Sequence, residues 1–291
     1  MAKLKHEKIN INDINDYLDN YSDFSFEISV LEKLTSAGFI CEHSGTYSDP
    51  ITNKTREFDI RAFKEELLSE NITFRFCLAV ECKNIQENCP LIIHCMKRTE
   101  QEAYNDLILS LYDEMSFGEL RWSQRIKLEG DKTFYQQGIF VGKSCDQVGR
   151  FASNHKITGY DADVFDKISQ AVNSTYDLFQ YNHKIGQKNH TFISFVLPIL
   201  VVPNDRIWTI GYDRNGSILE GPKTQKKLSY YIAKKWIAGA GTSHEKYWVS
   251  HLEITEIDSL LNLLYDHQSQ DRFSFTNIKN TIANTERRLL S

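Results

Sequence analysis

The stretch FRFCLAVECKN, residues 74–84, sets the interpretation of the chain. Its run of apolar, β-branched and aromatic residues predicts a buried strand over residues 72–83. Because side chains alternate across a strand, Cys82 falls on the apolar face, whereas Glu81 and Lys83 share the other face. A strand that is buried on one face therefore ends, on its second face, in a carboxylate and an ammonium.

The stretch TREFDIRAF, residues 55–63, alternates in the same way and predicts a second strand. Its Asp59 lies on the face opposite to Ile60. If the two strands adjoin in one meander, Asp59 and Glu81 converge, and two carboxylates repel each other unless a cation lies between them. Carboxylate oxygens suit Mg²⁺, and the main-chain carbonyl of Cys82 is a candidate for a further oxygen ligand.

A third carboxylate precedes these strands, in a helix that the apolar spacing predicts over residues 26–37. Glu27 shares the stripe of Val30 and Leu34, so it lies on the buried side near the helix start. A buried carboxylate needs a partner, which a metal ion or Lys83 would supply. The alternative interpretation is that Glu27 emerges at the helix start and interacts favourably with the helix dipole.

This order of helix with glutamate, strand, strand with aspartate and strand with E-x-K resembles the PD-(D/E)XK nuclease superfamily, in its Mrr-like branch. The matching stretches are FEISVLEKL, REFDI and VECKN, although Phe58 stands where the family name has a proline. The resemblance implies a restriction-endonuclease-like core of αβββαβ order. It also implies a nuclease that hydrolyses phosphodiester bonds of DNA, rather than RNA, with Mg²⁺ or Mn²⁺ as cofactor.

The same resemblance implies roles for individual residues. Asp59 and Glu81, with the carbonyl of Cys82, would bind the metal. Lys83 would be the catalytic lysine that orients the attacking water, and Glu27 would be an auxiliary acid.

Other residues are candidates for contacts with the nucleic acid. Gln170, on the helix predicted next, resembles a glutamine that some members carry there, and Lys97 and Arg98 follow the core closely. The stretch KTQKKLSYYIAKKW, residues 223–236, interleaves aromatic residues with lysines that include Lys226, Lys227, Lys234 and Lys235. Lysines offer phosphate contacts and aromatic rings offer base stacking, but a solvated amphipathic helix explains the pattern equally well.

Strands and helices mix along the chain, which predicts an α/β fold around one mixed central sheet flanked by helices. We expect residues 1–22 to form an N-terminal arm. Residues 23–291 are expected to form one nuclease-like domain with a largely helical insertion at about 97–160. Helices are predicted over residues 97–118 and 161–182.

The bulk composition sets limits on partners and location. A net charge of −5 argues against a broad basic surface, though not against a local basic patch. The N-terminus lacks the apolar segment of a secretory signal. The longest apolar run, residues 192–202, has about half of the ~20 residues that a membrane helix needs. A cytoplasmic protein with free cysteines and no membrane partner is therefore expected.

A rival hypothesis keeps the same fold without the chemistry. The protein would then be a catalytically silent module that holds nucleic acid or docks a partner protein. For an active enzyme, analogy with the family suggests restriction or antiphage defence, with a helicase or ATPase as partner and a homodimer to cut both strands.

Overall fold

The computed structural model describes residues 6–20, 22–113, 118–126, 135–151, 155–159, 162–181, 190–238 and 245–268. The described strands are β1 Ile40–Ser48, β2 Thr55–Ser69, β3 Ile72–Cys82, β4 Leu91–Lys97, β5 Asn105–Asp113, β6 Gly118–Ile126, β7 Phe140–Arg150, β8 Ile157–Gly159, β9 Thr191–Val202, β10 Ile207–Tyr212, β11 Ile218–Thr224, β12 Lys227–Ala238 and β13 Glu245–Glu256. The described α-helices are α1 Ile11–Asn20, α2 Phe24–Ser36, α3 Ala162–Tyr181 and α4 Leu260–Gln268, and short 3₁₀ helices span Glu100–Glu102 and Ile257–Ser259.

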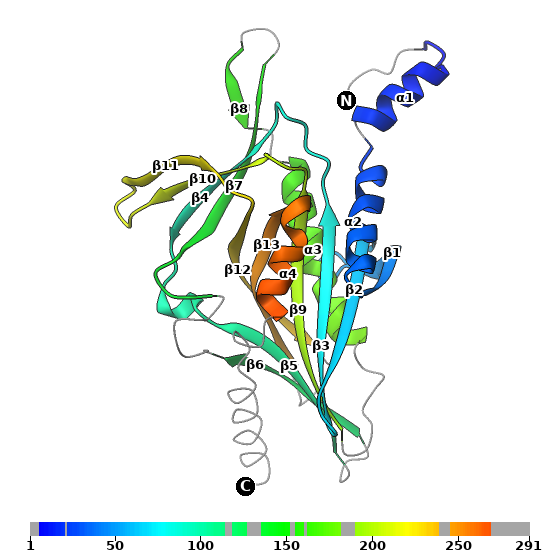
Figure 1. Cartoon of the computed structure of the whole chain (residues 1–291), viewed down its shortest axis with the longest axis vertical. Coiled ribbons are helices and arrows are strands. Elements are labelled where there is room, and N and C mark those ends of the chain that lie inside the picture. The colour runs from blue at the N-terminus through cyan, green and yellow to red at the C-terminus, as the bar shows by residue number, and fades with distance from the viewer. Residues whose placement is uncertain are drawn as a thin grey trace.

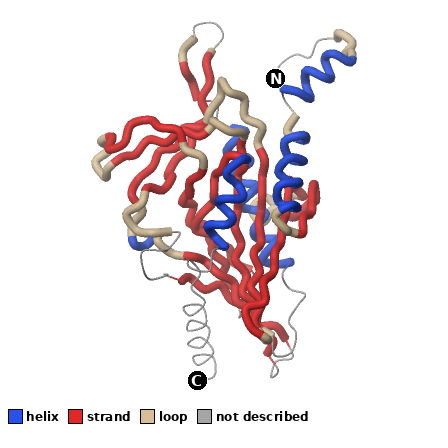
Figure 2. Tube along the Cα trace, viewed as in Figure 1, coloured by secondary structure: helices blue, strands red, loops and turns tan. Residues whose placement is uncertain are grey.

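These strands form one mixed sheet, which Figures 1 and 2 show with helices packed against it. The strand order is β1-β2-β3-β9-β13-β12-β7-β4-β10-β11, and β5, β6 and β8 pair off this path. The prediction of an α/β fold with a large mixed sheet is confirmed.

Strands β1, β2 and β3 form an antiparallel meander at one side of the sheet. The turn between β1 and β2 is closed by Asp49, whose carboxylate accepts hydrogen bonds from the main-chain N–H groups of Ile51 and Thr52. The β2–β3 register pairs Ile60 with Val80 at its end. One step further, the same register brings the next residues of the two strands, both polar, opposite each other.

Strand β9 lies parallel to β3, with Leu200 opposite Glu81, and β13 lies parallel to β9 on its other side. Parallel neighbours require a crossover connection, and α3 directly precedes β9. Nearly every residue of β3 is buried, because the strand is central and covered on both faces.

Helices cover both faces of the sheet and divide its core in two (Figure 1). On the first face, Val30 of α2 and Leu264 of α4 share an apolar cluster with Leu78 and Val80 of β3. We call this the α2/α4 face. It takes the even-numbered apolar side chains of β3.

The opposite face is covered by α3, and we call it the α3 face. Ile168 and Val172 of α3 belong to one apolar cluster with Cys77 and Ala79 of β3 and Leu252 of β13. The odd-numbered residues of β3 thus point toward α3. This division determines which charged residues can meet.

Several predicted elements are confirmed. The helix predicted over residues 26–37 is α2, and the one predicted over 161–182 is α3. The strands predicted over residues 55–63 and 72–83 lie within β2 and β3, to within one residue. Among the described residues, no helix is both long and apolar enough to cross a membrane.

The prediction of a largely helical insertion at about 97–160 is wrong for the residues that the structure describes. Instead of a helix over residues 97–118, a single 3₁₀ turn at Glu100–Glu102 leads into β5. Strands β6, β7 and β8 follow in the described parts of this region. The apolar residues of NDLILSLY, 105–112, fit both the strand and the helix period, and pairing of Ile108 with Ser194 of β9 selects the strand.

The helical alternative for residues 223–236 is also wrong, because most of this stretch lies in β12. Leu228, Tyr230 and Ile232 pack on the α3-face core at a spacing of two. The ladder with β13 then shifts register between Tyr231 and Lys234. Ala233, with φ of 48°, marks this bulge.

Candidate functional site

The two carboxylates predicted to converge meet at a single ammonium. Lys167 of α3 donates from Nζ to Asp59 Oδ1 and Oδ2, at 2.8 and 2.6 Å. It also donates to Glu81 Oε2 at 3.1 Å. Both carboxylates belong to odd-numbered positions of β2 and β3, which face α3. We call Asp59, Glu81 and Lys167 the acid cluster.

Lys167 is the residue that sequence reasoning missed. It belongs to a polar stripe of α3 that faces β1 and β2, in which Asn173 donates to Asp49 at 2.9 Å and Asp177 pairs with Arg61 at 2.8 Å. Together with Gln170 these polar residues follow one another at steps of three or four, which was the available signal. Pairing between that stripe and strands about a hundred residues earlier depends on the folded sheet, so the pattern alone does not identify the partners.

The acid cluster has more negative than positive charge. Burial disfavours the charged form of Lys167, but the charges of Glu81 and Asp59 outweigh it, and the pKa of Lys167 is raised. Burial, followed by the charge of Asp59, raises the pKa of Glu81 well above its usual range. Glu81 Oε1 is buried and has no hydrogen-bond partner among the residues that the structure describes. One ammonium therefore does not satisfy both carboxylates.

Glu27 lies at the same end of the sheet, in the first turn of α2. Its Oε2 lies 3.1 Å from Nε2 of His43 on β1. Burial raises the pKa of Glu27, the negative charge of Asp59 raises it further, and Lys167 lowers it. The charges of Asp59 and Lys167 therefore both act on the Glu27 carboxylate, although its direct partner is His43.

Lys83 does not contact the carboxylates it was predicted to serve. Its Nζ lies 3.3 Å from Oδ2 of Asp23, the residue before α2. The main-chain N–H of Asn84 donates to the other oxygen of Asp23 at 2.8 Å. The end of β3 is thereby tied to the start of α2, and the catalytic role of Lys83 stays a prediction.

Cys82 links the two strands through its main chain. Its N–H donates to Asp59 Oδ2 at 2.7 Å, and its side chain is fully buried in the α2/α4-face core. This hydrogen bond orients the Asp59 carboxylate toward α3. The role of the Cys82 carbonyl as a metal ligand stays a prediction.

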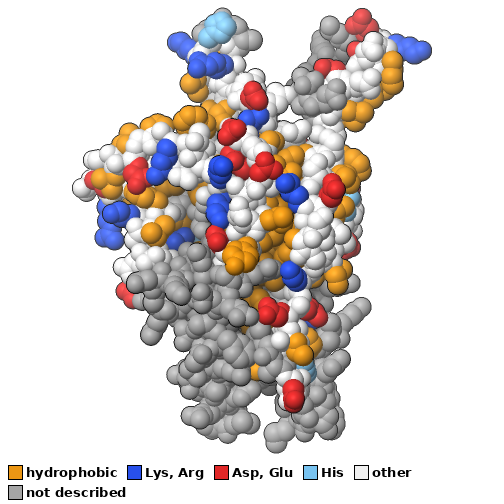
Figure 3. Space-filling view, viewed as in Figure 1, with side chains coloured by type: hydrophobic (Ala, Val, Ile, Leu, Met, Phe, Trp, Pro, Cys, Tyr) orange, Lys and Arg blue, Asp and Glu red, His pale blue; other side chains and the backbone are white. Residues whose placement is uncertain are grey.

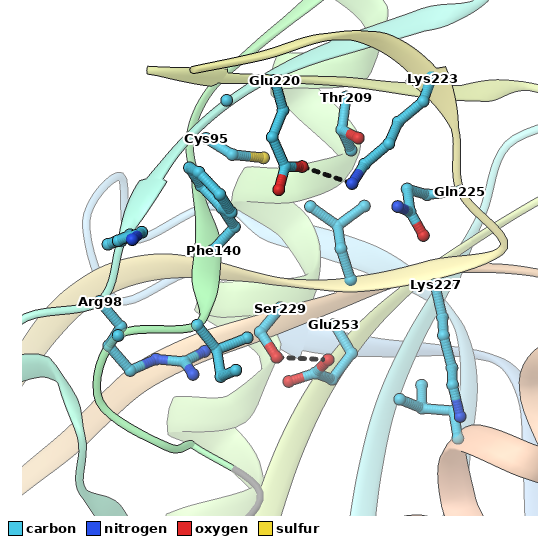
Figure 4. A pocket seen from close by; sticks show the side chains of 16 residues that line it. Cys95, Arg98, Phe140, Thr209, Glu220, Lys223, Gln225, Lys227, Ser229 and Glu253 are labelled. Carbon is cyan, nitrogen blue, oxygen red and sulfur yellow. Dashed lines mark hydrogen bonds and ion pairs between the residues drawn. The ribbon is translucent and has the colours of Figure 1, made fainter. Parts of the chain in front are cut away.

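The predicted substrate-binding residues fall into three places. Gln170 lies on α3, one turn beyond Lys167, and its main-chain carbonyl accepts a hydrogen bond from the Tyr47 hydroxyl at 3.5 Å. A second group, Lys97, Arg98 and Lys227, lines a cavity of about 530 Å³ (Figure 4), and Lys226 lies next to it in sequence. The third pair, Lys234 and Lys235, follows the β12 bulge, where each ammonium lies over a tryptophan ring.

This cavity and the acid cluster share no residue. Glu253 of β13 lines the cavity, and the neighbouring Leu252 and Ile254 belong to the α3-face core. The side chain of Glu253 therefore points to the α2/α4 face, whereas Glu81 points to α3. Cys95, Phe140 and Leu228, which also line the cavity, belong to or pack on the α3-face core, so the cavity is not confined to one face. Of the predicted nucleic-acid contacts, Lys97, Arg98 and Lys227 line this cavity, whereas Gln170 lies on the helix of Lys167.

The donor set of the acid cluster was compared with what a metal requires. In the part of the chain that the structure describes, no group of three or more His, Cys, Asp or Glu side chains is placed to hold a metal ion. Mg²⁺, however, is commonly held by one or two carboxylates, with water and substrate oxygens as its remaining ligands. Asp59 and Glu81, with one buried oxygen lacking a partner, fit that smaller requirement.

Comparisons with known proteins were also made. No known protein family, curated protein or solved structure matches this chain. The function is therefore inferred from the acid cluster and its surroundings.

Proposed function

We propose that this protein is a divalent-metal-dependent phosphodiesterase that cleaves nucleic acid, and DNA in particular, at the acid cluster. The observation that carries the proposal is the convergence of Asp59 and Glu81 on one cation at the end of two adjacent strands. Buried carboxylates that exceed their counterions require a further cation or a proton. A divalent ion meets that requirement.

Asp59 and Glu81 would hold the metal, with Mg²⁺ favoured for its preference for oxygen ligands. When bound, Mg²⁺ would supply electrostatic stabilisation of the charge that develops on the phosphoryl oxygens. Glu81 Oε1 is the acceptor available for it, because the other Glu81 oxygen and both Asp59 oxygens already accept bonds from Lys167.

Lys167, rather than Lys83, is the proposed catalytic ammonium. It lies against both carboxylates, and its raised pKa keeps it charged at neutral pH. A fixed positive charge at this position favours a transition state that carries more negative charge than the substrate. Lys83, paired with Asp23 at the strand end, would contact the nucleic-acid backbone or position α2.

The order of elements supports the proposal as well. Helix α2 is followed by the β1–β2–β3 meander, and α3 by β9 parallel to β3. This agrees with an αβββαβ core of the restriction-endonuclease type, into which β4 to β8 would be inserted. DNA as substrate, a helicase or ATPase partner, a homodimer and a defence role are proposed from the motif resemblance alone.

A silent module with the same fold is the second candidate, and one observation favours it. Lys167 already occupies the space between the carboxylates, as a structural ion cluster would require. In addition, Figure 3 shows Lys and Arg side chains interspersed with Asp and Glu over the visible face rather than gathered into a basic patch. A protein of this kind would bind without cleaving.

Plasmid nicking with Mg²⁺ or Mn²⁺ distinguishes the two candidates. We expect the wild type to nick supercoiled DNA, and Asp59→Asn and Lys167→Met each to lose about 100-fold or more of that rate. Lys33→Met is the matched control, because Lys33 forms an ion pair with the exposed Asp258, far from the acid cluster in the sequence. Metal-dependent nicking that survives in Asp59→Asn would refute the assignment.

Lys83→Met in the same assay separates the two lysines. A loss in Lys167→Met that greatly exceeds the loss in Lys83→Met supports the proposed role of Lys167. The reverse order would return the catalytic role to Lys83. Absence of nicking in the wild type, with no thermal stabilisation by either metal, would favour the silent module.

A further inference from the structure

The cavity lined by Arg98 and Glu253 has the features of a ligand site, and it shares no residue with the acid cluster. Its volume of about 530 Å³ lies within the range of sites for small molecules, about 300–1,000 Å³. Strands β4, β7, β10, β11, β12 and β13 contribute to its walls, together with α4. Figure 4 shows Glu220, Thr209 and Lys223 along one wall and Arg98, Ser229 and Glu253 along the other.

The charge of the walls favours an anion. Four basic side chains line the cavity, against the two acidic side chains of Glu220 and Glu253. Glu220 is paired with Lys223, and Lys227 is paired with Asp266 at 2.5 Å. Among the described residues, Lys97 and Arg98 have no carboxylate within ion-pair distance. Two cations at this cavity therefore form no direct ion pair, although the charges of Arg98 and Glu253 act on each other.

Of the two cations, Arg98 gives the stronger evidence for an anion site, because its side chain is deeply buried. Only 3% of Arg98 is exposed, and its Nη1 donates to the carbonyl of Gln136 at 3.1 Å. Its buried Nε has no partner in the described part of the chain. The guanidinium also lies 5.3 Å from the centre of the Tyr135 ring. A buried guanidinium that retains free donors fits the planar, bidentate recognition of a phosphate or carboxylate.

A second buried polar group without a partner lies on the facing wall. Thr209 of β10 is 6% exposed, and its hydroxyl has no hydrogen-bond partner. An unsatisfied buried hydroxyl costs stability, so its presence on a cavity wall indicates a ligand or water that completes its bonds. Gln225 and Ser229 add further polar groups to the same cavity.

The cavity also has a planar apolar surface. The Phe140 ring lies against β10, where a Cβ on Gly211 would come within 2.9 Å of it. The Phe140 ring therefore fits against β10 because Gly211 has no side chain. Leu228 and Leu263 extend this apolar part of the wall, and an aromatic ring of a ligand can stack on the exposed part of Phe140.

We infer that this cavity binds a small phosphorylated ligand with a planar ring, of the nucleoside monophosphate class. The phosphate would pair with Arg98 and Lys97, and the ring would lie against Phe140. Thr209 and Gln225 would hydrogen-bond to the ligand. This site goes beyond the proposed cleavage activity and does not depend on it, since the two share no residue.

Isothermal titration calorimetry with the full chain tests this inference. The probes are the four nucleoside 5′-monophosphates, the matching nucleosides and inorganic phosphate. We expect at least one monophosphate to bind at a single site, and its nucleoside and inorganic phosphate each to bind at least about tenfold more weakly. No measurable binding of any monophosphate would overturn the inference.

Two variants locate the site, and a third serves as control. Lys97→Met and Thr209→Val should each weaken binding, Lys97→Met by about tenfold. Lys226→Met is the matched control, because Lys226 is next to Lys227 in sequence but does not line the cavity. Unchanged affinity in both cavity variants, or an equal loss in the control, would place the ligand elsewhere.

The thermal stability of Thr209→Val separates ligand loss from unfolding. Because the Thr209 hydroxyl has no partner, its replacement by a methyl group of similar shape should leave the melting temperature of the unliganded protein unchanged or raise it. Weaker binding at an unchanged or higher melting temperature is the expected result. A marked fall in melting temperature would show that the hydroxyl serves the fold rather than a ligand.

Discussion

The acid cluster and the cavity lined by Arg98 and Glu253 contain the same types of charged residue in opposite proportion. Around Lys167, two carboxylates share one ammonium, and a buried oxygen of Glu81 is left without a partner. Around Arg98, cations exceed carboxylates, and a buried guanidinium nitrogen is left without a partner. One site thus favours a further cation and the other an anion, although both belong to one sheet.

The buried glutamates Glu81 and Glu253 differ in the charge of their hydrogen-bond partners. Glu81 accepts a bond from a charged ammonium, whereas Glu253 accepts bonds from two neutral hydroxyls, those of Tyr135 and Ser229, at 3.0 Å each. Burial raises the pKa of Glu253 to about 7, and the hydroxyl bonds only partly oppose it. The two glutamates thus share a residue type and a raised pKa but differ in their partners, a charged ammonium for Glu81 and neutral hydroxyls for Glu253.

Lys167→Met should have the largest effect on stability, because it leaves two buried carboxylates without a counterion. Removing one partner of a buried ion pair typically costs about 3–5 kcal/mol. We expect a loss of that size in the free energy of unfolding, measured by urea denaturation at pH 7.

The double variant Lys167→Met with Glu81→Gln tests the reason for that loss. It should recover much of the stability, because it removes one of the two unpaired charges. The surface control Lys33→Met should cost less than about 1 kcal/mol. A double variant no more stable than Lys167→Met would show that packing, rather than charge, is responsible.

How much of the acid cluster could be predicted follows from where its members lie. The strict alternation of β2 and β3 was enough to predict that Asp59 and Glu81 would share a face and converge. Lys167 lies 108 residues beyond Asp59 and 86 beyond Glu81. No local pattern encodes that pairing, which results from the crossover of α3 over the sheet.

The cavity was beyond prediction for the same reason. Lys97 and Arg98 were predicted as substrate contacts because they closely follow the core, and Lys227 because lysines and aromatic residues alternate around it. The three meet only because β4 and β12 both pair with β7. Residues 97–118, predicted to be helical, and residues 223–236, for which a helix was one alternative, carry apolar residues that suit both periods. Pairing with β9 and β13 decided their conformation.

Glu253→Gln should remove the pH dependence of stability that results from the raised pKa of Glu253. The folded-state pKa of about 7 lies above the usual 4.5, so the native protein holds the Glu253 proton more tightly than the unfolded chain. Wild-type stability should therefore fall as the pH rises from about 4.5 to 7 and stay lowered above that, by up to about 3 kcal/mol.

Urea denaturation at pH 5 and pH 8 measures this effect. Glu253→Gln should lose much less stability between the two pH values than the wild type, because its side chain stays neutral at both. Glu57→Gln, at an exposed position of β2, should behave as the wild type does. Equal pH dependence in wild type and Glu253→Gln would contradict a raised pKa at Glu253.

Substitutions at two glycines, one beside Phe58 and one in the cavity wall, should have the smallest effects on stability. A Cβ on Gly45 would come within 2.3 Å of the Phe58 ring, which is buried and lies 3.9 Å under the Arg61 guanidinium. A Cβ on Gly211 would meet the Phe140 ring at 2.9 Å, and that ring can move into the cavity. Gly45→Ala should therefore cost about 2 kcal/mol and Gly211→Ala about 1 kcal/mol or less.

Thermal denaturation of the two alanine variants, beside the wild type, measures this difference. If Phe140 moves into the cavity as expected, Gly211→Ala should also weaken nucleoside monophosphate binding, whereas Gly45→Ala should not. Equal destabilisation by the two substitutions would mean that Phe140 is held as firmly as Phe58.

Direct titration of Mn²⁺, followed by its electron paramagnetic resonance signal, asks whether the acid cluster binds a cation. We expect the wild type to take up Mn²⁺ at one site that Mg²⁺ displaces, Asp59→Asn to lack that site, and Lys33→Met to keep it. No uptake by the wild type, or equal uptake by all three proteins, would contradict a divalent-cation site formed by Asp59 and Glu81.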